Sequence, residues 1–332
     1  MDAKITKTRL SRMLSYDWIK IVLFSAVAII VWMLVFTMTA TRITPAQQFT
    51  VFNYAGNSSF STKFYDSYEK MLKNGVFSYE VIEANNNDLA VHTEYLHTVM
   101  EARLATNEGD VLYVSMENDP DTKYQDGEET KYLSYYQSFL NRWYYNVQRL
   151  DGEDGYFAEL EAYLNGFYSN GYEDKDSLNT ALVESSFRAR IKANKDKRFK
   201  KESEIQKGVQ DEIERIEKYR DALVNFYSYI DAGYVSFTEG KIESNVEGKY
   251  IIDGIYAINI CPNPETMGDV REYVSYYASY VDENGETQHK KTADNMQIVF
   301  LDLLPKGQEI FKGENLVYLN SVIESYCTAL KS

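Results

Sequence analysis

One apolar run dominates the first part of the chain. It covers residues 21–38, which carry no charged side chain, and it lies between Lys20 and Arg42. A helix of this length covers roughly 27 Å, which is close to the hydrocarbon thickness of a bilayer. The helix of a soluble core instead turns a polar face to water. The pattern therefore predicts one transmembrane helix over residues 18–40, between a tail of residues 1–17 and a linker of residues 41–48.

The charges beside this run set the expected orientation. Lysines and arginines gather before it, whereas Arg42 is the only basic residue between the run and Lys63. Because positive charge favours the cytoplasmic side, we expect a single-pass cell-membrane protein with a cytoplasmic N-terminus and an extracellular C-terminal domain. A cleaved signal peptide is the alternative. The run is longer than the usual apolar region of about 7–15 residues, and residues 38–40 make a poor cleavage site, which favours the uncleaved anchor.

After the linker, short apolar segments alternate with segments of helical spacing. Residues 49–56 form an apolar strand pattern that ends at Gly56, and the next apolar side chains recur three or four positions apart. Strands joined by helices in this way are expected to be parallel, with the helices packed on the sheet. The expected elements are a strand at 49–56, a helix at 62–73, a strand at 78–84, a polar turn at 85–88, a helix at 92–106 and a strand at 109–115.

These residues resemble the opening of a known family. FTVFNYAG at 49–56, KFYDSYEKMLKNGVFSYEVIEANNN at 63–87 and EYLHTVMEARLATNEGDVLYVS at 94–115 are similar to bacterial extracellular solute-binding proteins of sugar-type ABC importers. The resemblance implies a type 2 periplasmic-binding fold, carbohydrate binding and a transporter permease as partner. The chain departs from the family in having a transmembrane helix in place of a lipid-anchoring cysteine. A flavodoxin-like or other doubly wound α/β domain fits the same pattern.

The middle of the chain is expected to be helical and its end to return to strands. Residues 205–230 carry an apolar side chain at every third or fourth position, which predicts one long helix. The basic stretch at 188–201 is interpreted as a solvated helix face, with contact to anionic headgroups, wall polymer or a permease as the alternative. The expected architecture is an α/β lobe of residues 49–119 and 248–332, with residues 120–247 as a helical insertion or second lobe. Further helices are expected at 131–149, 156–167 and 315–330, and strands at 249–260, 274–280, 288–292 and 296–304.

Composition narrows the classes of partner. The net charge of −15 disfavours nucleic acid, and 29 tyrosines suit half-exposed surfaces that stack on sugars or peptides, or simply partly buried positions. Cys261 and Cys327 are the two cysteines. Outside the cell they can form a disulfide, and two buried free thiols are the equal alternative.

Motifs for catalysis or metal binding are not found. His92 and His97 flank a glutamate, but a zinc-protease helix needs two histidines four residues apart, and these are five apart. The acidic stretch at 118–131 lacks the calcium-loop spacing. We therefore expect no enzyme activity, no cofactor and no metal; an unspecified pair of carboxylates acting as a glycosidase is the remaining alternative.

A ligand of a parallel α/β sheet binds beyond the carboxyl ends of its strands. The amides and carboxylate there can hydrogen-bond hydroxyl groups, while a tyrosine stacks on a ring. The alternative, which we favour on residue type, is that these are turn and helix-cap residues. The candidate ligand-binding residues are Asn53, Tyr54, Asn57, Ser58, Asn85, Met116, Glu117 and Asn118.

The sequence thus predicts a membrane-anchored extracytoplasmic binding protein that captures a sugar or peptide, and that serves an ABC transporter. A non-catalytic accessory or structural subunit, which no longer binds a small ligand, is the second hypothesis. A deep cleft lined by tyrosine and asparagine favours the first. A filled cleft with an exposed apolar stripe on residues 205–230 favours the second.

Overall fold

The computed structural model describes residues 7–39, 43–54, 60–62, 68–89, 95–127, 129–243, 249–263, 270, 274–327 and 330. The chain divides into two compact units, Met1–Thr44 and Pro45–Ser332. The first unit holds helix α1, Lys7–Thr39. Within α1, Trp18–Phe36 is long and apolar enough to cross a membrane, and none of it is buried against protein. The expected N-terminal apolar helix is confirmed, in agreement with a single-pass anchor.

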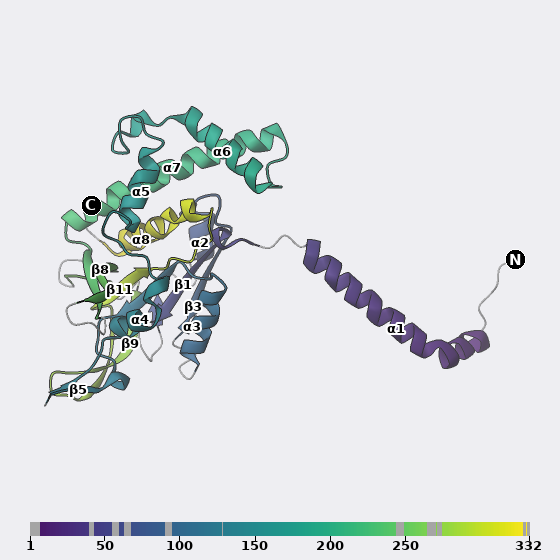
Figure 1. The fold of residues 1–332 in the computed structure, drawn as a ribbon, viewed down its shortest axis with the longest axis horizontal. Coiled ribbons are helices and arrows are strands. Elements are labelled where there is room, and N and C mark those ends of the chain that lie inside the picture. Colours follow the sequence, from purple (N-terminus) through teal and green to yellow (C-terminus); the bar gives the residue numbers. More distant parts are fainter. Residues whose placement is uncertain are drawn as a thin grey trace. The chain divides into compact units, whose positions relative to one another are not determined.

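The second unit is built on a mixed sheet of six strands (Figure 1). Strand β1 pairs in parallel with β3 on one side and with β4 on the other, as the alternating pattern predicts. Strand β11 is antiparallel to β4, so the C-terminal segment completes the sheet that begins near Phe49. In sheet order the strands are β3 (Glu83–Asp88), β1 (Gln48–Tyr54), β4 (Val111–Ser115), β11 (Met296–Phe300), β8 (Tyr250–Asn259) and β7 (Ser236–Glu243).

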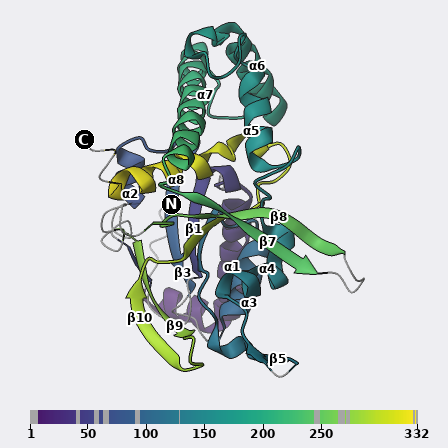
Figure 2. The same cartoon turned by 90° about the vertical axis from the view of Figure 1, so that its left-hand side faces the viewer.

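Helices cover both faces of this sheet (Figure 2). Residues alternate along β1, so that Phe49 and Val51 enter one core and Phe52 and Tyr54 enter the other. The first core is closed by α2 (Tyr68–Lys73), α5 (Tyr156–Asn165), α7 (Glu202–Asp231) and α8 (Gly313–Tyr326), and the second by α3 (Leu96–Ala105) and α4 (Tyr135–Trp143). The fold is therefore mixed α/β with eight α-helices among the described residues. A periplasmic-binding fold remains a prediction.

Two small sheets lie outside the main one. Strand β9 (Val274–Val281) pairs with β10 (Thr287–Thr292) and with β2 (Phe60–Thr62). The turn between β9 and β10 contains Gly285 at a φ of +79°, and its sequence at 282–285, Asp-Glu-Asn-Gly, is typical of a hairpin turn. Strands β5 (Tyr124–Asp126) and β6 (Glu129–Lys131) form a short hairpin within the expected acidic loop.

The second expected strand was misplaced. The sequence predicts it at residues 78–84, but β3 begins at Glu83 and its Asn-Asn-Asn-Asp segment, expected to be a turn, forms strand hydrogen bonds with β1. Because β3 is an edge strand, only one side of its backbone is paired and polar side chains are tolerated there. Of the apolar residues before it, Phe77 and Val81 belong to a loop that packs in the first core, whereas Ile82 is exposed.

Some helix ends also differ from expectation. Helix α4 starts at Tyr135 rather than at residue 131, because the Ser134 hydroxyl accepts a hydrogen bond from the backbone N–H of Gln137 at 3.0 Å. Strand β2 occupies residues 60–62, where the first expected helix begins; the described part of that helix is α2, and residues 63–67 lie outside the described part. Helix α7 confirms the long helix.

The basic stretch is largely exposed to solvent, as the favoured interpretation expects, and two of its arginines also pair with buried carboxylates. Arg190 on α6 (Thr180–Asn194) pairs with the buried Glu212 of α7 at 2.6 Å, which joins the two helices. Arg198, in the connection between them, pairs with Glu80 at 3.0 Å and so ties the α6–α7 hairpin to the rest of the unit. The lysines of the stretch, by contrast, are exposed.

The expected lobes share one compact unit. Strand β7, which belongs to residues 120–247, pairs along its length with β8 of the expected α/β lobe. Cys261 and Cys327 are both buried as free thiols, which is the second of the two alternatives considered above.

Candidate functional site

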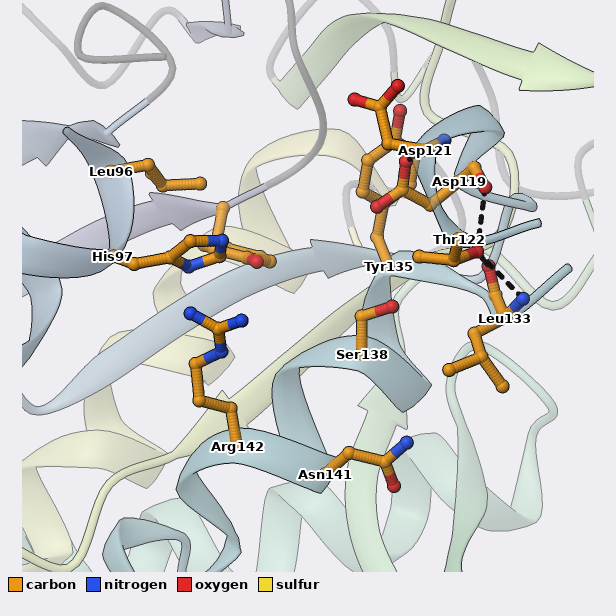
Figure 3. Close-up of a pocket in the computed structure, with 11 residues that line it drawn as sticks. Leu96, His97, Asp119, Asp121, Thr122, Leu133, Tyr135, Ser138, Asn141 and Arg142 are labelled. Atoms are coloured by element: carbon orange, nitrogen blue, oxygen red, sulfur yellow. Dashed lines mark hydrogen bonds between the residues drawn. The ribbon is translucent and has the colours of Figure 1, made fainter. Parts of the chain in front are cut away.

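A cavity of about 720 Å³ lies beyond the carboxyl ends of β1 and β4 (Figure 3). Its floor includes Tyr54, the last residue of β1. Its walls come from the start of α3, from the loop after β4 and from one face of α4. The lining residues are Tyr54, Leu96, His97, Asp119, Asp121, Thr122, Leu133, Tyr135, Ser138, Asn141 and Arg142.

The loop after β4 is held in place by its own hydrogen bonds. The Asp119 carboxylate accepts from the backbone N–H of Asp121 at 3.0 Å, which starts the short 3-10 turn Pro120–Thr122. The Thr122 hydroxyl donates to the carbonyl of Asp119 at 2.7 Å and accepts from the N–H of Leu133 at 2.9 Å. The acidic wall of the cavity is therefore tied to the segment that leads into α4.

Helix α4 has one face for the cavity and another for the core. Tyr135, Ser138 and Arg142 recur at steps of three and four residues and line the cavity. Phe139 and Trp143 lie on the adjacent side of the helix and are buried in the second core, to which Tyr135 also belongs. The helical period thus places Ser138 and Arg142 at the cavity and Phe139 and Trp143 in the core.

Aromatic rings support the floor. The ring of Tyr54 lies 5.6 Å from that of Phe139 and 5.8 Å from that of Trp143. The imidazole of His97 is 5.6 Å from the Trp143 ring, and the Arg142 guanidinium lies 5.6 Å from the same ring. These packed rings hold the charged side chains above them at fixed positions.

The charges of the cavity are separated in space. Figure 3 shows Arg142 and His97 on one side, and Asp119 and Asp121 on the other. Burial, followed by the nearby Arg142, lowers the pKa of His97. Burial also raises the pKa of Asp119, and burial with the Asp119 charge raises the pKa of Tyr54 to about 12. Arg142 is the one guanidinium among the described lining residues.

Of the sequence-predicted residues that the structure describes, Tyr54 lines the cavity, whereas Asn53, Asn85, Met116, Glu117 and Asn118 are not among its lining residues. The Asn53 amide donates to Asn86, and the Asn85 amide donates to Glu83. Met116 packs against the second core, the Glu117 carboxylate accepts from Asn295, and Asn118 forms a β-bridge with Ser134. Asn57, Ser58 and His92 lie outside the described residues.

Tyr54 is the one lining residue that the sequence analysis predicts, and the titratable residues that it misses are His97, Asp119, Asp121 and Arg142. Asp119 directly follows the last candidate residue, so the rule on strand ends was one position short. Arg142 lies in the helix expected at residues 131–149, and only the three-and-four spacing from Tyr135 to Arg142 indicates its polar face. His97 was considered only as a metal ligand. In the described part of the chain, no group of three or more His, Cys, Asp or Glu side chains is placed to hold a metal ion.

Comparison with protein-family models, curated proteins and solved structures finds no match to this chain. The resemblance to solute-binding proteins therefore remains a prediction. The side chains of the cavity offer hydrogen bonds, two carboxylates and one guanidinium to a ligand.

Proposed function

We propose that this protein is a membrane-anchored binding protein that captures a small polar solute, a sugar or a short peptide, outside the cytoplasm. The observation that supports the proposal is the cavity at the carboxyl ends of the parallel strands. Its volume of about 720 Å³ falls within the range of about 300–1,000 Å³ that is typical of ligand pockets. Its lining by tyrosine, asparagine and charged groups suits a polar ligand.

The apolar stripe of α7 argues against the accessory-subunit alternative. Ile216, Leu223 and Phe226 are fully buried within the unit. They pack in the first core together with α8, and the amide of Asn320 on α8 donates to the carbonyl of Ala222 at 2.7 Å. The stripe is therefore used inside the unit and does not offer an exposed face to a partner. Delivery of the solute to a transporter permease rests on the family resemblance alone.

Thermal unfolding of the full-length chain in detergent, with a panel of sugars, amino acids and short peptides, tests the proposal. A ligand at 100 times its Kd stabilises the folded state by about 2.7 kcal/mol. Asn141→Trp places a large ring at the cavity wall and is expected to abolish the shift. Asn194→Trp makes the same change on an exposed part of α6 and is expected to retain it.

Absence of any shift across the panel would favour the accessory-subunit hypothesis. A shift that survives in Asn141→Trp would place the ligand outside this cavity and would overturn the assignment of the site.

A further inference from the structure

Arg142 differs from the other arginines of the second unit. Among the described residues, Arg103, Arg149, Arg188, Arg190, Arg198, Arg215 and Arg220 each form an ion pair with a carboxylate. Arg142 forms none with the carboxylates that the structure describes, and its guanidinium only stacks on Trp143. Guanidinium groups in proteins bind carboxylates in a planar, two-bond geometry, so this arginine can receive one from a ligand.

Asp119 is the complementary group on the other side of the cavity. It is half-buried, and its carboxylate accepts only the backbone N–H of Asp121 among the described donors. A half-buried carboxylate without a cation is destabilised by lost hydration, which agrees with the raised pKa of Asp119. An ammonium group placed beside it would restore the missing charge partner. Asp121 lines the same wall and adds a second negative charge.

Hydroxyl groups that line the same cavity can also accept or donate hydrogen bonds to a ligand. The Ser138 hydroxyl lines the cavity, is buried, and has no hydrogen-bond partner among the described residues. Tyr54 lines the same cavity, and the charges of Asp119 and Arg142 both act on its hydroxyl. Buried hydroxyls are normally paired, so a ligand with amide or carbonyl groups in this region would satisfy them.

We propose that the ligand is a zwitterionic amino compound, a short peptide with free ends, with its carboxylate at Arg142 and its ammonium at Asp119. This inference rests on the proposed function and narrows its ligand class from sugar or peptide to peptide. The net charge of the cavity favours this class, because two carboxylates and one guanidinium repel a purely anionic ligand. A neutral sugar would leave both Arg142 and Asp119 without a charge partner.

Isothermal titration of the full-length chain in detergent with L-Ala-L-Ala and tri-L-alanine tests the inference. The same peptides carrying an N-acetyl group or a C-terminal amide lack one charge each. Each blocked peptide is expected to bind about 10- to 100-fold more weakly, since a charge-assisted contact is lost.

The variants assign each charge to its residue. Arg142→Gln is expected to weaken binding of the free peptide by a similar factor and to leave binding of the C-terminal amide unchanged. Asp119→Asn keeps the oxygen that accepts the hydrogen bond from the N–H of Asp121. It is expected to weaken binding of the free peptide by a similar factor and to leave binding of the N-acetyl peptide unchanged. Arg149→Gln, which alters an arginine paired with Asp151 outside the cavity, is the matched control and should leave binding unchanged.

The outcomes separate the two proposals. Binding of a sugar, glucose or maltose for example, without binding of either peptide would overturn the zwitterion and leave the binding function standing. A peptide affinity that is unchanged by blocking either end and by either variant would also overturn it. Absence of binding by every sugar and peptide would remove both the ligand class and the proposed function.

Discussion

At the scale of single residues, the Arg215 guanidinium on α7 is fully buried and held by several partners. It donates to Glu212 at 2.7 Å and to the carbonyl of Ile310 at 2.8 Å, and Arg190 pairs with the same Glu212. Burial alone would raise the pKa of Glu212, but Arg215 and Arg190 hold it below its usual range. This network joins α6, α7 and the segment before α8, and removing one member would leave another charge buried without its partner.

Asp110 gives a prediction on pH. Burial, with the charge of Glu314 nearby, raises the pKa of this half-buried carboxyl to about 8, although it accepts from the N–H of Thr50 at 2.7 Å. Below the unfolded pKa of about 4 both states are protonated. As pH rises from about 4 to 8 only the unfolded state ionises, so the folded state loses stability, by no more than about 1.4 kcal/mol per pH unit.

Asp110→Asn is expected to flatten this dependence, because an amide cannot ionise and still accepts from Thr50. Denaturant unfolding at pH 5 and pH 8 measures the difference. Asp154→Asn, an exposed position, should retain the slope of the unaltered chain. A variant at Asp110 that keeps the full slope would show that this carboxyl is already ionised in the folded protein.

At the scale of elements, α7 is the long helix that joins the α6–α7 hairpin to the sheet. Its buried residues recur at steps of three and four, so one face packs against α8 and the opposite face carries charged side chains. Its first turn carries Glu202 and Glu204, whose negative charges stabilise the helix by interacting with the positive end of its dipole. The helix thus agrees with local propensity and with packing at once, which explains why the sequence predicts it well.

Leu223→Ala on α7 is expected to destabilise the unit by about 2–5 kcal/mol, because Leu223 is fully buried and its truncation leaves a cavity in the first core. Glu217→Ala, on the exposed face of the same helix, should change stability by no more than about 0.5 kcal/mol. Denaturant midpoints measure both. Equal effects of the two substitutions would contradict the packing of α7 in the first core.

At the scale of the whole molecule, the chain joins two compact units that suit different surroundings, lipid for the first and water for the second. The first unit exposes apolar side chains along Trp18–Phe36, whereas the second buries its apolar residues in two cores on the two faces of the sheet. An exposed apolar helix of this length is stable beside lipid and promotes aggregation in water. The second unit has the burial of an independent domain.

A chain lacking residues 1–44 is therefore expected to remain monomeric without detergent and to unfold at the same temperature as the full-length protein in detergent. The full-length chain is expected to float with lipid vesicles, and the shortened one to stay in solution. Flotation and circular dichroism measure these outcomes. Vesicle binding by the shortened chain, or its failure to fold, would contradict the division into an anchor and a self-contained body.

The sequence by itself determined the features that depend on local periodicity. The apolar run, the parallel order of the first strands, helix α7 and the β9–β10 hairpin follow from spacing and turn residues within short windows. The position of β3 depended on tertiary structure, because an edge strand can be polar and a buried loop can be apolar.

The cavity was decided by the tertiary structure as well. Tyr54, His97, Asp119 and Arg142 come from four separate segments, and no spacing in the sequence relates one to another. Their meeting depends on how α3 and α4 pack on the sheet. Every other described arginine of the second unit forms an ion pair with a carboxylate, and Arg142 does not. This difference depends on the folded arrangement and cannot be deduced from the sequence.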